Sequence, residues 1–282
     1  MSDQNKGATQ VVTQAISRML DEGSAGVLVT FIDLPEPEPT GLRVGSRFLA
    51  IESAAYVSSL GAPELDEAVA RHAHDFFSAR EDARSIKVEE FAAGLSQFHG
   101  VHLLFERIQA EPRLVIAGAG HVGAALARLA ALVGYRVTLI DDRAEFLSRD
   151  LFAAPGEQGI NLAVAEDWSG AVREAIGTGR GVSIAIVTRG HKQDEDCLRA
   201  AIAANPFYIG MIGSKRRTRI VLDKLRAEGG DEDKLKNVRA PIGLDIGAVS
   251  PEEVALAILA EIVAERRGGS GSSLSRWRKN AK

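Results

Sequence analysis

The chain has 282 residues, of which 45% are hydrophobic and 26% charged, and its formal net charge at pH 7 is −4. This near-neutral balance argues against a dedicated nucleic-acid-binding protein, and no apolar stretch approaches the ~18 residues of a membrane span. The polar N-terminus lacks a signal-peptide pattern and the chain has one cysteine, so we expect a cytoplasmic protein of about two domains.

Residues 1–111 are the acidic part of the chain, with 9 basic and 17 acidic residues and a net charge of −8. The spacing of apolar residues predicts helices over 9–21 and 63–80. Runs rich in β-branched residues predict strands over 25–32, 47–51, 55–60, 85–91 and 101–108. This order predicts a smaller α+β domain over 1–111, which ends near Glu111-Pro112.

From residue 112 the pattern changes to strands that alternate with helices. The predicted strands cover 114–117, 135–140, 162–165, 182–187 and 208–212. Helices are predicted over 121–133, 194–204 and 215–228, and a last one begins at Pro251 with a capping box from Ser250 to Glu253. The alternation predicts an α/β fold with a Rossmann-like parallel sheet over 112–267. The Gly/Ser-rich basic segment 268–282 is predicted to be a disordered tail.

The sharpest motif follows the first strand of this second domain. Gly118-Ala119-Gly120-His121-Val122-Gly123 matches G-x-G-x-x-G and stands between a predicted strand and a predicted helix. Gly118 permits a tight turn, Gly120 lets the backbone approach a phosphate, and Gly123 lets the helix pack close to the strand. The start of the helix then presents free N–H groups to an anion. The alternative is a strand-to-helix turn that only needs small residues.

The next predicted strand ends in two carboxylates, Asp141 and Asp142. Asp141 lies 18 residues after Gly123, which is near the spacing of a ribose-binding carboxylate. Arg143 follows directly, and an arginine at this place can accommodate a phosphate. These residues predict a cofactor site, with NAD(P) as one possible cofactor. The alternative is a helix cap combined with a surface ion pair.

Arg189 and His191 follow the predicted strand over 182–187. Ligands of open α/β sheets bind at the carboxyl ends of the strands, so we expect both residues near the Gly118 turn. His191 could act as an acid or base, or donate a hydrogen bond to a heterocycle. The alternative is that it only helps to begin the following helix.

Two further segments are candidates for ligand binding. Ser214 is a good helix cap, whereas the cations Lys215 and Arg216 oppose the helix dipole unless they meet an anion. Their alternative is a solvated basic face. Asp245 lies in an apolar, glycine-spaced segment over 241–248, which predicts a loop packed against a ligand or a partner. Its alternative is a tight buried connection.

The remaining reactive side chains predict neither a catalytic centre nor a metal site. Cys197, the single cysteine, lies inside a predicted helix and is expected to be a buried apolar residue. His72 and His74 are two residues apart and therefore do not share a helix face.

Four blocks of the chain, in this order, resemble the XdhC/CoxI family of accessory proteins for molybdenum hydroxylases such as xanthine dehydrogenase. They read LVIAGAGHVGAALARLAALVGYRVTLIDDR, VTRGHKQDEDCLRAAI, YIGMIGSKRR and APIGLDIGAVSPEEVALAILAEIVAERRG. The resemblance covers about residues 113–268 and extends more weakly over 10–110.

This resemblance implies a Rossmann-like C-terminal domain behind a smaller N-terminal domain. It implies a maturation factor without turnover of its own, which binds the molybdenum cofactor as molybdopterin or its dinucleotide form. Such a protein assists sulfuration of the cofactor and its insertion into an apo-hydroxylase. The expected partners are the molybdenum hydroxylase apo-enzyme, a cysteine desulfurase and a second copy of the chain in a homodimer.

Two alternative functions remain at this point. The Gly118–Gly123 loop could serve an NAD(P)-dependent oxidoreductase, or the chain could be a dimeric scaffold that binds nothing. The chain also differs from its family in one respect. Many members carry a cysteine and a Gly-Gly stretch in the N-terminal half, where this chain has Ser59-Leu60-Gly61-Ala62-Pro63-Glu64. The difference argues against a thiolate ligand or a persulfide relay in that domain.

Overall fold

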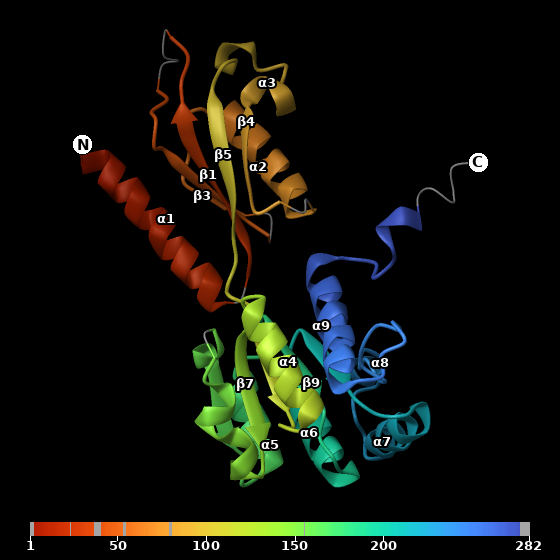
Figure 1. The fold of residues 1–282 in the computed structure, drawn as a ribbon. Coiled ribbons are helices and arrows are strands. Elements are labelled where there is room, and N and C mark those ends of the chain that lie inside the picture. The colour runs from red at the N-terminus through yellow and green to blue at the C-terminus, as the bar shows by residue number, and fades with distance from the viewer. Residues whose placement is uncertain are drawn as a thin grey trace. The chain divides into compact units, whose positions relative to one another are not determined.

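The computed structural model describes residues 3–22, 24–36, 41–52, 55–78, 81–154 and 156–276. The chain divides into two compact units, Met1–Ala110 and Glu111–Lys282 (Figure 1). No helix within the described ranges is both long and apolar enough to cross a membrane.

The first unit is an antiparallel sheet with helices on both faces. Its strand order is β3-β2-β1-β5-β4. The strands are β1 (Gly26–Asp33), β2 (Arg47–Ile51), β3 (Tyr56–Val57), β4 (Ala83–Lys87) and β5 (His102–Ile108). The helices are α1 (Asp3–Asp21), α2 (Pro63–Ser78) and α3 (Val88–Phe91), with a 3₁₀ turn at Ser96–Phe98.

Successive residues of β2 show how the two faces are covered, because neighbouring side chains of a strand point to opposite faces. Phe48 packs in the core cluster that includes Leu65 and Val69 of α2. Leu49 packs with Met19 of α1 in a separate cluster. The sheet therefore lies between α1 and α2.

Two strands of this unit are shorter than the sequence predicts. The predicted strand over 85–91 ends at Lys87, and residues 88–91 form α3. Glu90 accepts a hydrogen bond from the Lys87 N–H at 3.0 Å, which favours a helical turn over an extended chain. The predicted strand over 55–60 is reduced to Tyr56–Val57, since Ser58 has a φ of +74° and leaves the extended conformation.

The segment from Ser59 to Glu64 leads into α2 and is organised by a buried carboxylate. Asp66 accepts hydrogen bonds from the Ser59 hydroxyl at 2.5 Å and from the Leu60 N–H at 2.7 Å. The Ser59 hydroxyl also accepts from the Gly61 N–H at 3.0 Å. These contacts give Ser59 a role in the structure of the loop.

The second unit is a doubly wound parallel sheet with the order β10-β9-β6-β7-β8, which confirms the predicted Rossmann-like fold. The strands are β6 (Arg113–Ala117), β7 (Arg136–Asp141), β8 (Ile160–Val164), β9 (Val182–Ile186) and β10 (Tyr208–Met211). The helices are α4 (His121–Leu132), α5 (Trp168–Ile176), α6 (His191–Ala204), α7 (Lys215–Ala227), α8 (Glu232–Lys236) and α9 (Pro251–Arg267).

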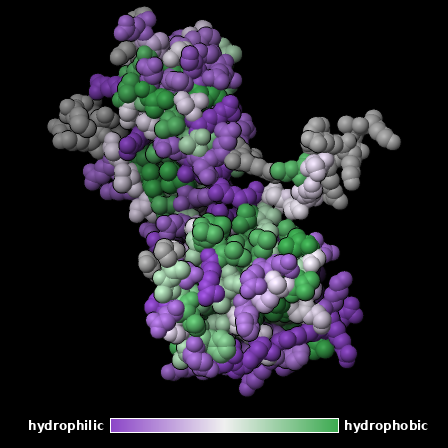
Figure 2. All heavy atoms as spheres, in the orientation of Figure 1, coloured by the Kyte–Doolittle hydropathy of each residue, from purple (hydrophilic) through white to green (hydrophobic). Residues whose placement is uncertain are grey.

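Both faces of this sheet are buried, as the alternation along β6 shows. Leu114 and Ile116 pack in the cluster that contains α4 and α9. Val115 packs with α5, α6 and α7 on the opposite face. Figure 2 shows an apolar area on the surface of this unit, over α4 and α9, and Leu132 and Leu256 are exposed side chains of these helices.

Helices α5 and α8 were not predicted, and α6 begins three residues earlier than expected, at His191. Cys197 is fully buried in α6, which confirms its predicted role as a core residue. The predicted tail lies partly outside the described residues, which end at residue 276. Its described part contains a short 3₁₀ helix, Leu274–Arg276.

Candidate functional site

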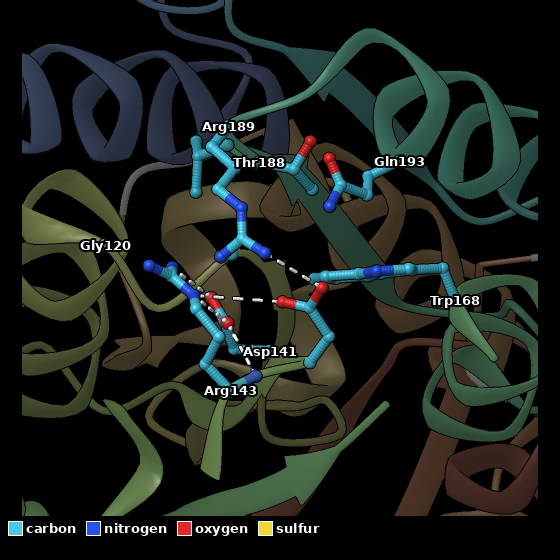
Figure 3. Close-up of a pocket in the computed structure, with 10 residues that line it drawn as sticks. Gly120, Asp141, Arg143, Trp168, Thr188, Arg189 and Gln193 are labelled. Carbon is cyan, nitrogen blue, oxygen red and sulfur yellow. Dashed lines mark hydrogen bonds and ion pairs between the residues drawn. The ribbon is translucent and has the colours of Figure 1, made fainter. Parts of the chain in front are cut away.

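A pocket of about 70 Å³ opens at the carboxyl ends of four neighbouring strands, β6, β7, β8 and β9 (Figure 3). The strand order reverses between β6 and β9, where open α/β sheets bind their ligands. The lining residues are Gly118, Gly120, Asp141, Asp142, Arg143, Trp168, Val187, Thr188, Arg189 and Gln193.

The three glycines of the turn have different reasons to be glycine. Gly118 has a φ of +114°, and a Cβ there would lie 2.6 Å from the Val187 carbonyl oxygen. A Cβ on Gly123 would lie 1.8 Å from the Gly118 carbonyl oxygen. Both are therefore required by the fold. A Cβ on Gly120 would meet no described heavy atom within 4 Å, so only Gly120 keeps open the space in front of the helix.

The N–H groups of the turn divide into paired and available ones. Gly118 donates to the Ile140 carbonyl at 2.7 Å, and Ala119 donates to the Asp141 carboxylate at 2.7 Å. Gly120 is the cap residue of α4, and no described side chain caps this helix. The first N–H groups of α4, from His121 onward, have no intrahelical acceptor because of helix geometry. A helix start of this kind is suited to an anion, because its N–H groups and its dipole favour negative charge.

Asp141 holds the turn together. Its side chain is 2% exposed and accepts from the Ala119 N–H and, at 2.9 and 3.1 Å, from the Arg143 guanidinium. Burial by itself raises the pKa of Asp141, but these hydrogen bonds outweigh burial and the pKa lies below its usual range. Asp141 is therefore an ionised structural group.

Asp142 has the exposure that a ligand-binding carboxylate needs. Its side chain is 29% exposed and pairs with Arg189 across the pocket at 3.2 Å. Arg143 stacks on the ring of Phe146, with 3.8 Å between the guanidinium carbon and the ring centroid. The pocket thus holds two carboxylates and two guanidinium groups, which balance one another in charge.

A buried ion pair between Asp194 and Arg217 lies behind the pocket. Asp194 is fully buried and accepts hydrogen bonds from the Thr188 hydroxyl and from Arg217 of α7. Burial raises the pKa of Asp194 above its usual range, although both partners favour the ionised form. The positive charge of Arg217 is therefore directed into the protein.

The other predicted site residues lie outside the pocket lining. Ser214 caps α7 by accepting from the Arg217 N–H at 3.2 Å, and Lys215 and Arg216 are exposed on its first turn. His191 is exposed at the start of α6, and Asp245 is exposed in its loop. His121, Val122 and Gly123 follow the lining residue Gly120 along α4. In the ranges that the structure describes, no three His, Cys, Asp or Glu side chains are grouped as a metal site.

Trp168 and Gln193 line the pocket although sequence reasoning missed them. Trp168 follows β8 and opens α5, a helix whose short apolar face gave no clear periodicity. One signal was available, since Asp167 directly before it is a good helix cap and accepts from the Gly170 N–H at 2.6 Å.

The fold and this pocket define a Rossmann-like domain with a pocket beside its first glycine turn. Residues 114–262 match the XdhC Rossmann domain, and the chain belongs to that family. It is 34% identical over 160 residues to the Escherichia coli (strain K12) protein named "Uncharacterized protein YqeB", covering 57% of this chain and 28% of YqeB.

Two further relatives carry descriptive names. A Bacillus subtilis (strain 168) protein, named as a probable xanthine dehydrogenase subunit, is 29% identical over 166 residues, covering 59% of this chain and 46% of the relative. "Molybdenum cofactor insertion chaperone PaoD" of Escherichia coli (strain K12) is 38% identical over 69 residues, covering 24% of this chain and 22% of PaoD. The chain thus spans less than half the length of these curated relatives.

A crystal structure described as a xanthine dehydrogenase from Bacillus halodurans has the same fold. It superimposes with a TM-score of 0.59 at 18% identity, covering 97% of this chain and 70% of that chain. At this identity the likeness concerns the fold alone.

Proposed function

We propose that this chain is an accessory protein that binds the molybdenum cofactor and assists its sulfuration and its insertion into a xanthine dehydrogenase-type hydroxylase. The observation that carries the proposal is the uncapped start of α4 at Gly120, in a chain of the XdhC family. The cofactor is cargo here, and its phosphate is the group that the N–H groups of α4 would hold. The relative named as a molybdenum cofactor insertion chaperone supports the same role.

The size of the pocket fits the phosphate end of this cargo. A space of about 70 Å³ is roughly twice the ~30 Å³ share of one liquid water molecule, so it suits a small group such as a phosphate and is too small for a pterin. The pterin body must then lie outside this space, beyond the mouth of the pocket. A ligand held at one end in this way remains accessible for transfer to another protein.

The charge balance of the pocket also suits reversible binding. An arriving phosphate competes with Asp142 for Arg189, whose side chain is 50% exposed. An exposed pair of this kind contributes only about 0 to 1 kcal/mol, so breaking it opposes binding weakly. The cargo is thus held by backbone N–H groups and a movable arginine.

Sulfuration requires a sulfur donor, and the chain offers none at its surface. Cys197 is its one cysteine, and burial raises the pKa of the Cys197 thiol well above its usual range. We therefore propose that a cysteine desulfurase supplies the sulfur and that the apo-hydroxylase receives the cofactor. The expected homodimer stays a prediction, for which sedimentation velocity gives the mass.

The test compares two glycines whose Cβ positions are both open. Gly120→Asp places a carboxylate where the phosphate would bind, and Gly159→Asp adds the same charge to the same unit away from the pocket lining. Both variants and the parent chain are purified from a host that makes the pterin, and molybdenum and pterin are measured by elemental analysis and mass spectrometry. We expect Gly120→Asp to lose at least tenfold of both, and Gly159→Asp to retain them. Equal cofactor content in all three proteins, or hydroxylase activity in cells independent of this chain, would contradict the proposal.

An NAD(P)-dependent oxidoreductase is the second candidate, because Asp142 lies beside the glycine turn at the place of a ribose-binding carboxylate. Titration with NAD⁺ and NADP⁺, followed by a test for hydride transfer, separates the two. Binding together with turnover would favour the oxidoreductase, whereas no binding of either nucleotide would remove it.

A further inference from the structure

Trp168 gives the pocket an aromatic wall that neither the glycine motif nor the family assignment explains. It opens α5 directly after β8, and its backbone is fixed by Asp167, which caps the helix. The indole packs partly against the core cluster of α5 and α6. In Figure 3 the ring is seen edge-on, with Arg189 and Gln193 on one side of its plane. That face of the ring borders the pocket.

The order of groups across the sheet matches the order of groups in a nucleotide. Gly120 follows β6, Asp142 follows β7 and Trp168 follows β8, and these strands are neighbours. Adjacent strands are about 4.7–4.9 Å apart, so the distance from the end of β6 to the end of β8 is about 10 Å. A phosphate at Gly120 and a ribose at Asp142 would bring the attached base to Trp168.

We propose that Trp168 is the stacking platform for the base of a nucleotide whose phosphate is bound at the start of α4. This inference rests on the proposed function and makes it more specific, since it assigns the dinucleotide form of the molybdenum cofactor as the cargo. Stacking on an indole is sequence-tolerant because every base has a π face. The platform therefore selects for the presence of a nucleotide, and the identity of its base must be read elsewhere.

The base needs room that Arg189 and Gln193 border. Arg189 is half-exposed and makes the exposed ion pair with Asp142, so its side chain can rotate into solvent on a fast timescale. Gln193 folds over Gly190, where a Cβ would lie 1.9 Å from its Oε1. The absence of a side chain at Gly190 thus provides the space that this amide occupies. Once a nucleotide is bound, the ribose hydroxyls can replace Arg189 as partners of Asp142.

A pterin ring is also planar, so it is the competing occupant of this wall. The form of the cofactor without a nucleotide has no ribose. Its binding would leave Asp142, between Gly120 and Trp168, without a group of the ligand to contact. The nucleotide accounts for all three positions, which is why we favour it.

The chain allows a direct optical test because it has only two tryptophans, Trp168 and Trp277. In a Trp277→Phe protein the fluorescence reports Trp168 alone. We would titrate this protein with CMP, GMP and AMP, with ribose 5-phosphate and inorganic phosphate, and with neopterin as a pterin without a nucleotide. We expect at least one nucleotide to quench the emission, and ribose 5-phosphate to compete with it without quenching.

Calorimetry on variants completes the test. Trp168→Leu should weaken nucleotide binding about tenfold and leave ribose 5-phosphate binding unchanged. The nucleotide affinity of Trp168→Phe should lie between those of the parent and Trp168→Leu. Equal nucleotide affinity of Trp168→Leu and the parent, or quenching by neopterin alone, would overturn the inference.

The outcomes also separate this inference from the proposed function. If no nucleotide quenches Trp168 but Gly120→Asp still loses molybdenum, the cargo role stands and the nucleotide platform falls. If nucleotides stack on Trp168 but the chain purified from a pterin-making host carries no molybdenum, the platform stands and the cargo role falls.

Discussion

Two strand-to-helix turns at the same edge of the parallel sheet look alike in sequence and differ in what they can bind. The turn between β6 and α4 contains Gly118, and the turn between β10 and α7 contains Gly213, each with a positive φ. The first helix begins at Gly120 without a capping side chain. The second is capped by the Ser214 hydroxyl.

The difference lies in which groups of the protein already occupy the helix start. In the second turn Ser214 satisfies one N–H group, and Arg217 is directed toward the buried Asp194. In the first turn Asp141 takes only the Ala119 N–H, and the groups from His121 onward remain available. The first turn therefore leaves the start of its helix open, whereas in the second turn a side chain of the protein caps it.

The largest expected effect separates two glycines of the first turn. Gly123→Ala should destabilise the second unit by about 3 kcal/mol or more, because its Cβ would overlap the Gly118 carbonyl. Gly120→Ala, which meets open space at a φ of −64°, should change stability by less than about 1 kcal/mol and still weaken anion binding. Urea unfolding gives both values. Similar losses of stability in the two variants would show that Gly120 is also required by the fold.

An intermediate effect concerns the carboxylate that closes the first turn. Asp141→Asn should cost about 1 to 3 kcal/mol at pH 7, since the buried Ala119 N–H and the partly buried Arg143 guanidinium lose a charged acceptor. The folded pKa of Asp141 lies below its usual value of about 3.9, so its ionised form stabilises the protein above that pH. This contribution is lost as the pH falls through the folded pKa, and the variant and parent should converge in acid.

Urea unfolding of the parent and of Asp141→Asn at pH 7, 5, 4 and 3 checks this convergence. Asp194→Asn, which changes the buried partner of Arg217, is expected to show the opposite pH dependence. Burial raises the pKa of Asp194, so its contribution is present below the usual pKa and falls as the pH rises through the folded value. A pH-independent difference between Asp141→Asn and the parent would contradict the assigned role of Asp141.

The smallest effect is expected in the second turn. Ser214→Ala removes a helix cap and should cost about 1 kcal/mol of unfolding free energy. It should leave phosphate binding at Gly120 unchanged, because Ser214 lies outside the pocket lining. Thermal unfolding and phosphate titration measure the two quantities. A loss of phosphate binding would assign the second turn to the site as well.

The fold was largely predictable because its signals are local. The buried strands of the parallel sheet are continuous apolar runs, and α4 and α9 have clear helical periods and start signals. Helix α5 was missed because its nine residues include Gly170 and small alanines, which blur the apolar face. The end of β4 was missed because a single hydrogen bond from Lys87 to Glu90 begins α3 there.

The candidate site was predictable only where its residues are close in sequence. The G-x-G-x-x-G turn is a local pattern, and so is the pair of carboxylates at the end of β7. The ion pair of Arg217 with Asp194 joins residues 23 positions apart, and no spacing rule predicts it. Trp168 reaches the pocket because it follows β8, which lies next to β7 in the sheet. Only the strand order reveals this neighbourhood.

The burial of Cys197 has a practical consequence for studying this protein. A thiol with no solvent contact can react with an alkylating reagent only when the helix above the sheet opens. Because the chain holds no second cysteine, the labelling rate reports the opening of the Rossmann unit alone, free of any signal from residues 1–110. Slower labelling in the presence of a small-molecule ligand would then measure how much that ligand stabilises the unit against opening.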